Sequence, residues 1–506
     1  MTLQTSVTVN VSNSYSSINT ATQGSVHRNH RYRTTFEQLV EAVARYQIDN
    51  QPSDDLQETH FTISLTGEES QFTRFNQAKV RQSGHVRDAQ IKLTLISCHR
   101  VPAQDDSDSD NEVHQDGRTA STTIPFTGDF DVDWPLTQSA LTRLQQELPL
   151  LPVDPYIVLP LSAEADNIQR RQTQTVLSGH LLNESDIANA LLKPVHTLDF
   201  SGFYAGGLSY RAYADSAGKR HWFETPSFTL DYSLFGGRAQ EAVKGTFAGV
   251  RWQQTAYEKS IEAAAKQLTL LTRPVKALPR GSYRTYLAPA AVADIIDIIV
   301  WGGGLGEAAL RQGNSAFGKL EKGEGTLSEQ FSLGEDFQRT SLPRFNSSGE
   351  IAPARLSLIE GGRWKNSLVS GRSAKEYGKP SNGANEEEAM RAPTVAPGTL
   401  KEKDILNELG TGLYISNLHY LNWSDLTAGR ITGMTRYACF WVEEGEIVAP
   451  IENLRFDDDL YRFLGEGLIG LTDQQTFIPA VSTYDRRSLG GMWVPGMLID
   501  QFRYTL

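Results

Sequence analysis

Residues 410–456 read GTGLYISNLHYLNWSDLTAGRITGMTRYACFWVEEGEIVAPIENLRF, and this stretch decides the fold class of the chain. Apolar and aromatic residues alternate in it with small and polar ones in short runs, for example from Ala438 to Val442. Glycines punctuate these runs at Gly429, Gly433 and Gly445. Period-two alternation between glycine-marked turns is typical of an antiparallel meander with one buried face, and we predict one here.

The N-terminal part begins with a helical pattern and continues with strands. Residues 34–38 (TTFEQ) could form a capping box, and the apolar side chains that follow recur at helical spacing. From His60 to Arg100 the apolar period is two, which predicts strands on which this helix packs. A further strand at 120–126 and an amphipathic helix around 141–148 follow.

The central part alternates again and ends in a long helix. Residues 223–232 have the period of a strand, and Ser216 to Gly218 could form the turn that pairs it with the preceding strand. From Trp252 to Leu271 the apolar spacing is helical, and the Arg273-Pro274 pair favours a helix end just before it.

These patterns predict an α+β protein, with an N-terminal helix-plus-sheet domain and a larger, mainly antiparallel β C-terminal domain. We expect four segments: a flexible tail at 1–33, an N-terminal α+β domain at 34–160 with an acidic loop at 103–117, central strands and a long helix at 161–275, and the C-terminal domain at 276–506.

The composition excludes several classes of partner. The 506 residues carry a formal net charge of −12, so neither nucleic acid nor an anionic membrane would be attracted to the surface. The longest apolar run, 290–301, is shorter than the roughly 20 residues of a spanning helix. The two cysteines, Cys98 and Cys439, are too few for a disulfide framework and are typical of a reducing compartment. We therefore expect a cytoplasmic protein.

Three stretches of the chain carry a resemblance to a known family. They are ESQFTRFNQAKVRQ at 69–82, the segment from Asp215 to Tyr232 with its Ser-x-Gly turn, and GMTRYACFWVEEGEIVAPIENLRF at 433–456. They resemble the TldD/PmbA family, which includes proteins described as modulators of DNA gyrase. The resemblance implies a C-terminal domain of that type. In characterised members a zinc peptidase subunit pairs with a metal-free partner subunit.

The resemblance also implies where zinc ligands should lie. In catalytic subunits a helix carries His-Glu, three residues and a second His, and a cysteine comes from the C-terminal region. Residues 288–297 occupy that place here and contain no histidine, glutamate or cysteine, and 472–506 contains no cysteine. The positions without ligands begin with Ala288, Pro289, Ala290, Ala291, Val292 and Ala293. The resemblance thus implies a TldE/PmbA-like subunit with no catalytic or metal-ligating residues of its own.

Other candidate ligands are poorly placed in the sequence. Asp294 and Asp297 would share a helical face, but two carboxylates hold zinc poorly and the next histidine is His419. His221 and Glu224 lie three apart on a predicted strand, so their side chains should point to opposite faces.

The function implied by the resemblance is proteolysis of unfolded peptides inside a cavity closed by two subunits. This chain would shape the cavity, while a TldD-like catalytic partner would supply the zinc. Polar residues that cluster among glycines are our candidates for peptide or subunit contacts: Asn422, Trp423, Thr432, Gly433, Thr435 and Arg436. Two alternatives stay open: a homodimeric peptide-binding or scaffold protein with no peptidase role, and an active metallopeptidase with unconventional ligands.

Overall fold

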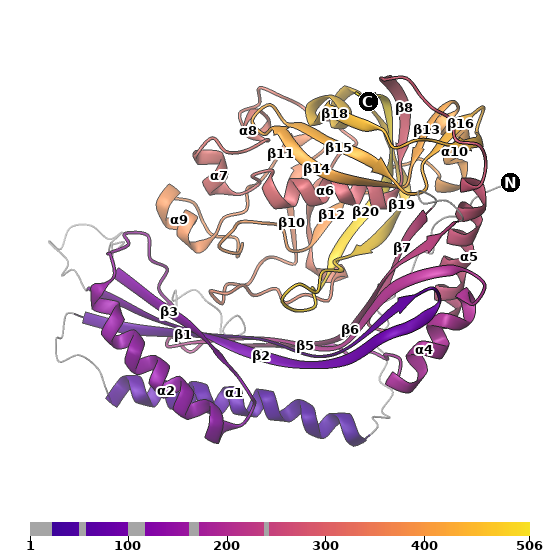
Figure 1. The fold of residues 1–506 in the computed structure, drawn as a ribbon. Helices are drawn as coiled ribbons and strands as arrows, with labels where there is room; N and C mark the ends of the chain where they lie inside the picture. Colours follow the sequence, from indigo (N-terminus) through magenta and orange to yellow (C-terminus); the bar gives the residue numbers. More distant parts are fainter. Residues whose placement is uncertain (1–22, 50–56, 100–116, 161–171, 237–241, 506) are drawn as a thin grey trace.

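The computed structural model describes residues 23–49, 57–99, 117–160, 172–236 and 242–505. In these parts the chain forms a seven-stranded and a thirteen-stranded sheet, with helices on both (Figure 1). The predicted α+β class, with an N-terminal helix-plus-sheet region and mainly antiparallel sheets, is confirmed. The acidic loop predicted at 103–117 lies outside the described residues except for its last residue.

The N-terminal sheet is built on a hairpin of two very long strands, β1 (Gln57–Asn76) and β2 (Lys79–His99). The strand order is β3-β2-β1-β5-β6-β4, with β7 paired to β6. The other strands are β3 (Gly117–Pro125), β4 (Gln172–Val176), β5 (Asp199–Asp215), β6 (Arg220–Phe235) and β7 (Ala242–Gly249). This sheet joins strands on both sides of residue 160, where the sequence suggested a domain boundary; the boundary itself stays a prediction.

Two helices, α1 (Gln23–Asp49) and α2 (Phe130–Glu147), cover the outer face of this sheet (Figure 1). Their apolar faces pack on alternate residues of the long hairpin, and Leu39 and Ile63 are fully buried there. α1 begins at Gln23, within the segment predicted as a tail. The proposed capping residue Thr35 therefore lies inside the helix, where its hydroxyl donates to the Gly128 carbonyl oxygen (2.9 Å) and ties α1 to the start of α2.

The C-terminal sheet follows the order β11-β10-β9-β12-β20-β8-β13-β16-β17, with β14, β15, β18 and β19 attached beside this path. Its first strands are β8 (Gly281–Leu287), β9 (Leu333–Asp336), β10 (Arg355–Glu360), β11 (Arg363–Trp364), β12 (Pro393–Val395) and β13 (Gly412–Ile415). The others are β14 (Asn417–Asp425), β15 (Arg430–Arg436), β16 (Phe440–Glu443), β17 (Glu446–Pro450), β18 (Arg455–Asp459), β19 (Leu468–Pro479) and β20 (Gly491–Tyr504).

The quoted stretch 410–456 forms two hairpins rather than one meander. β14 pairs with β15 and β16 pairs with β17, while β13 pairs antiparallel with β16 and parallel with β8. Gly429 and Gly445 lie at the hairpin turns with positive φ, as predicted. Gly433 is not at a turn but within β15, where a Cβ would lie 2.7 Å from the Phe456 ring.

Helices position the two sheets against each other. α6 (Pro289–Gly302) is buried against the C-terminal sheet through Val292, Ile296 and Ile299, and α5 (Gln254–Leu271) confirms the long helix predicted there. The remaining α-helices are α4 (Glu184–Leu192), α7 (Glu307–Arg311), α8 (Gly318–Glu321), α9 (Gly371–Tyr377) and α10 (Ile405–Leu409). The C-terminal part lies on the inner face of the curved N-terminal sheet (Figure 1).

A buried arginine fixes this arrangement. Arg487, from the segment between β19 and β20, reaches into the N-terminal sheet with only 2% of its surface exposed. Its guanidinium donates to the Ser227 and Ser209 hydroxyls and to the Gly207 carbonyl oxygen, and it lies 4.0 Å from the Glu68 carboxylate. Arg487 thus joins the C-terminal part to the centre of the N-terminal sheet, and the neighbouring Arg486 adds an ion pair with Asp88 on β2.

Candidate functional site

Helix α6 contains the residues at which the family resemblance would place zinc ligands in a catalytic subunit. Ala288 is its N-cap residue and Pro289 its first residue, a position that tolerates proline because no helical N–H is needed there. The side chains of Ala291, Val292 and Ala293 are buried in the C-terminal core. This first part of α6 therefore packs the core and offers no oxygen, nitrogen or sulfur side-chain atom to a metal.

Asp294 is the first polar side chain of α6. It is partly buried, and one of its carboxylate oxygens accepts a hydrogen bond from the Leu418 backbone N–H at 2.8 Å. Burial raises the pKa of Asp294 to about 7; the Leu418 hydrogen bond opposes this shift and the nearby Asp297 carboxylate adds to it. Near neutral pH the group is therefore divided between its acid and carboxylate forms.

Strand β14 runs beside α6 and is an edge strand. Within the described ranges it pairs with β15 and with no other strand. The side chains of His419, Tyr420 and Asn422 are exposed, and Tyr420 has a positive φ of 52° that interrupts the regular strand. An edge of this kind could accept an extended peptide by backbone hydrogen bonds.

The six predicted contact residues are brought together on the β14–β15 hairpin, where Asn422 pairs with Thr432. Two of their hydroxyls are used inside the protein: Thr432 donates to the Phe456 carbonyl oxygen (2.9 Å), and the Thr435 oxygen accepts from the Leu454 N–H (2.8 Å). Thr435 is fully buried, so it could not contact a peptide directly.

Two of the six predicted contact residues have exposed polar side chains. Asn422 and Arg436 are exposed, and the Arg436 guanidinium lies 5.3 Å from the centre of the Tyr437 ring. Trp423 is partly buried against the C-terminal core, and its indole N–H is buried without a hydrogen-bond partner among the described residues. That nitrogen faces the end of α6, because a Cβ on Gly302 would lie 3.2 Å from it.

His221, considered above as a ligand, and the C-terminal cysteine Cys439 lie apart, each with its own neighbours. His221 is buried between the Thr173 hydroxyl (2.9 Å) and the Gly349 carbonyl oxygen (3.1 Å), on a strand as predicted. Cys439 donates its S–H to the Arg436 carbonyl oxygen (3.2 Å), and burial raises the pKa of its thiol to about 11.

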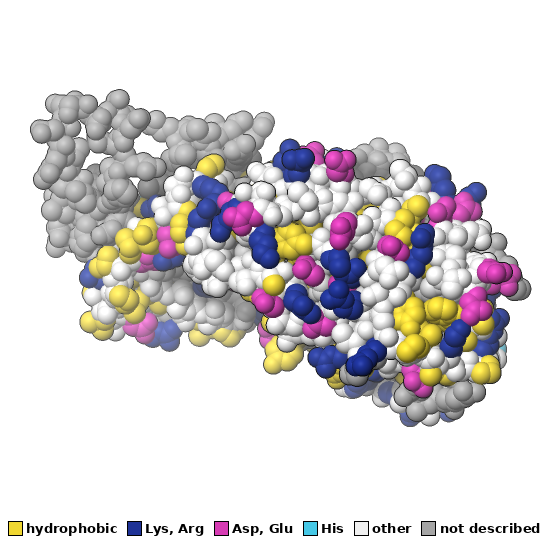
Figure 2. Space-filling view, turned by 90° about the horizontal axis from the view of Figure 1, so that it is seen from above, with side chains coloured by type: hydrophobic (Ala, Val, Ile, Leu, Met, Phe, Trp, Pro, Cys, Tyr) yellow, Lys and Arg dark blue, Asp and Glu magenta, His cyan; other side chains and the backbone are white. Residues whose placement is uncertain are grey.

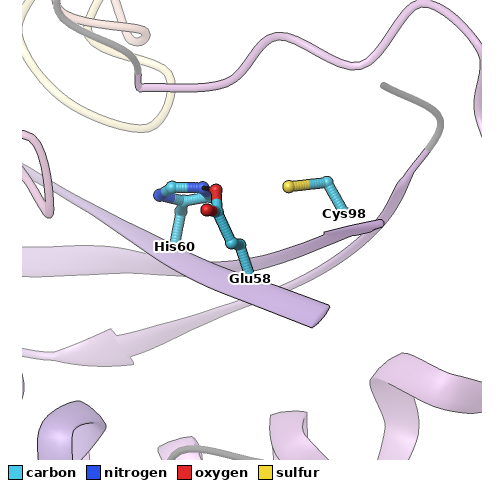
Figure 3. A group of neighbouring side chains, drawn as sticks. All are labelled: Glu58, His60 and Cys98. Carbon is cyan, nitrogen blue, oxygen red and sulfur yellow. Dashed lines mark ion pairs between the residues drawn. The ribbon is translucent and has the colours of Figure 1, made fainter. Parts of the chain in front are cut away.

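One group of potential ligands was missed by the sequence analysis. Glu58 and His60 on β1 and Cys98 on β2 lie together at one end of the long hairpin (Figure 3). Their ligand atoms all lie within 4.8 Å of one another. The signals in the sequence were a Glu-x-His pair near the start of one strand and a cysteine near the end of the next, but only the strand pairing brings them together.

One face of the molecule shows how its charged side chains are distributed. In Figure 2, basic and acidic side chains are interspersed over the described residues of that face, so no continuous basic surface is seen there. No helix in the described part of the chain is long and apolar enough to cross a membrane.

Comparisons with known proteins agree with this geometry. Solved structures with this fold include a Thermotoga maritima protein described as a modulator of a DNA gyrase, with a TM-score of 0.70, 14% identity, and coverage of 93% of this chain and 100% of that one. TldE from Thermococcus kodakarensis has a TM-score of 0.67 and 13% identity, with coverage of 92% of this chain and 100% of that one. A Bacteroides thetaiotaomicron protein described as a modulator of DNA gyrase has a TM-score of 0.69 and 13% identity, with coverage of 93% of this chain and 98% of that one. Identities this low show the fold alone.

A search of curated proteins finds no match. Residues 280–505, which contain α6 and the β14–β15 hairpin, match the model of the PmbA/TldA metallopeptidase C-terminal domain. Residues 280–505 therefore form a C-terminal domain of the PmbA/TldA metallopeptidase type, in a chain that has the fold of those three structures.

Proposed function

We propose that this chain is the non-catalytic, TldE-like subunit of a TldD/TldE-type metallopeptidase complex. Its C-terminal domain would form part of the wall of a cavity that accepts unfolded peptides. A partner subunit of the TldD type would supply the zinc and the general base. Enclosure by two subunits would keep folded proteins away from the metal.

The observation that carries this proposal is the chemistry of α6. The helix that would present His-Glu and a second His in a zinc subunit here presents alanine, proline and valine, most of them buried or at the helix start. The first polar group, Asp294, is already hydrogen-bonded to Leu418. A lone carboxylate in that position is a poor zinc ligand and could not replace two imidazoles.

The β14–β15 hairpin is the peptide-contacting surface in this proposal. The edge of β14 that pairs with no strand would provide backbone groups, beyond the Leu418 N–H that Asp294 already holds, to grip a peptide of any sequence. Asn422, Trp423 and Arg436 lie on the same hairpin. Sequence-independent contacts suit a subunit that selects for unfolded chains rather than for one substrate.

The test combines this chain with a TldD-type subunit that carries the zinc motif. Cleavage of a quenched fluorescent unfolded peptide is followed for each subunit alone and for the mixture, with and without a chelator. We expect a stable hetero-complex and chelator-sensitive cleavage that depends on the zinc subunit. Chelator-sensitive cleavage by this chain alone, or a homodimer that does not bind the zinc subunit, would overturn the proposal.

A matched pair of variants tests the hairpin. Trp423→Ala should raise the KM of the complex for the peptide several-fold, because an aromatic side chain on the edge strand itself is lost. Tyr484→Ala removes an aromatic side chain that is 94% exposed and lies on the segment between β19 and β20, outside the hairpin. It should leave the KM unchanged.

A further inference from the structure

We propose that Glu58, His60 and Cys98 form a Zn²⁺ site on the N-terminal sheet, outside the C-terminal domain that the family model matches (Figure 3). The site would bind the metal through one carboxylate, one imidazole and one thiolate. Its fourth position would be open to water.

Strand pairing places the three side chains on one face. Glu58 and His60 are two residues apart on β1, so they point to the same side of the sheet. Cys98 is the direct cross-strand partner of Glu58 on β2, and direct partners also share a face. Ile63 and Leu65, in the other alternation of β1, point toward α1 and α2, so the three side chains lie on the face away from these helices.

The separation of the ligand atoms is close to what zinc requires. The three atoms lie within 4.8 Å of one another, and His60 Nε2 is 3.6 Å from Glu58 Oε2. Zinc bonds of about 2.0–2.3 Å in a tetrahedron place ligand atoms roughly 3.3–3.8 Å apart. Small rotations of the side chains would therefore close the group around an ion, without movement of the strands.

The imidazole is held in an orientation that suits coordination. Its Nδ1 lies 3.3 Å from the Ser216 hydroxyl oxygen. Its Nε2 is buried, faces Glu58 and has no hydrogen-bond partner in the described parts of the chain. When Nδ1–H donates to Ser216, the lone pair of Nε2 points toward the carboxylate, and two electron-rich atoms then face each other. A proton on Nε2 or a cation between the two atoms would remove this conflict. A zinc-bound histidine usually has its other ring nitrogen hydrogen-bonded, as Nδ1 is here to Ser216.

The exposure and the chemistry of the three side chains suit Zn²⁺. Cys98 is fully buried, while the side chains of His60 and Glu58 are 16% and 29% exposed, so an ion could enter from one side. The nearby Asp215 carboxylate is already hydrogen-bonded to the Tyr213 hydroxyl and the Lys219 N–H. Thiolate with imidazole favours Zn²⁺ over Ca²⁺ or Mg²⁺, which prefer oxygen ligands throughout.

The test uses the full chain, stripped with a chelator and titrated with Co²⁺ as a spectroscopic substitute for Zn²⁺. We expect about one equivalent of Co²⁺ to bind, with a thiolate-to-cobalt charge-transfer band and visible d–d bands of tetrahedral intensity, and Zn²⁺ to displace it. Cys98→Ser should abolish the charge-transfer band, and His60→Gln should weaken Co²⁺ binding at least tenfold. Circular dichroism confirms that each variant is folded.

Cys439→Ser is the matched control, because Cys439 is the other buried cysteine and lies in the C-terminal sheet. It should leave the spectrum unchanged. A charge-transfer band that survives Cys98→Ser, or Co²⁺ binding without any such band in the unmodified chain, would overturn the proposal.

The proposed zinc site and the proposed non-catalytic role can be tested independently. A zinc ion at Glu58, His60 and Cys98 says nothing about peptide cleavage, so the zinc content of the unmodified chain does not decide whether its C-terminal domain is catalytic. The metal content of Cys98→Ser does bear on that question: zinc that remains in this variant would point to a second site.

Discussion

The Asp294 carboxylate on α6 accepts a hydrogen bond of 2.8 Å from the Leu418 backbone N–H at the start of β14. This bond joins the helix that lacks zinc ligands to the strand that we propose contacts peptides. It also keeps a carboxylate in an apolar setting, with a pKa raised to about 7.

The first prediction concerns pH and Asp294. The pKa of Asp294 in the folded state is higher than the ordinary value of 3.8. The folded chain therefore binds more protons between about pH 4 and 7, and Asp294 costs stability as the pH rises through this range. Asp294→Asn keeps an acceptor for Leu418 without the charge. The variant should gain on the order of 2 kcal/mol relative to the unmodified chain between pH 5 and pH 8.

Urea unfolding at the two pH values measures this gain. Replacing the exposed Asp500 by Asn gives the control. The cause assigned to the Asp294 pKa is wrong if the stability difference between Asp294→Asn and the unmodified chain does not change with pH.

The second prediction concerns the glycine within β15. A Cβ at Gly433 would lie 2.7 Å from two atoms of the Phe456 ring, so Gly433→Ala should cost about 1–3 kcal/mol by overpacking. At Gly318 a Cβ would meet no atom within 4 Å, and Gly318→Ala should be neutral or slightly stabilising. The urea concentration at the unfolding midpoint is measured for both variants. Equal midpoints would show that β15 can shift away from Phe456.

The third prediction concerns Arg487. Arg487→Ala leaves the Glu68 carboxylate, 3% exposed, without its nearby charge and should cost about 3–5 kcal/mol. Arg45→Ala removes an exposed arginine that is paired with Glu41 one helical turn away, and should cost under about 1 kcal/mol. Thermal unfolding compares the two, and similar losses would mean that Arg487 does not fasten the sheets together.

The fourth prediction concerns the two thiols. Cys98 and Cys439 are 0% and 2% exposed, and the raised pKa of Cys439 keeps it protonated at pH 8. Neither should react rapidly with a thiol-specific disulfide reagent in the native chain, and both should react in denaturant. Fast reaction of one thiol in the folded chain would show that its strand opens locally.

The sequence alone predicted those elements whose signals are local. The helix ending at Leu271 and the turns at Gly429 and Gly445 follow from spacing and from glycine in the left-handed region. The order of strands around residues 410–456 was not predictable in this way, because β13 pairs with β8, more than a hundred residues earlier.

The Glu58, His60 and Cys98 group was hidden for a different reason. Its assembly depends on the exact pairing of β1 with β2, and the turn of this hairpin uses Gln77 and Ala78 at positive φ, where glycine or asparagine would be expected. Without a recognisable turn, the partner of Glu58 could not be found. The same lack of local signal hid Arg487, whose partners lie on distant strands.

The contact between Glu68 and Arg487 also sets an order of events during synthesis. The two residues are separated by 419 positions, so at typical translation rates roughly 20–80 s pass between their appearance on the ribosome. For that time the centre of the N-terminal sheet holds a carboxylate whose arginine has not yet been made. Until nearly the whole chain has been translated, the Glu68 carboxylate therefore has only water and near neighbours such as the Ser70 hydroxyl as partners.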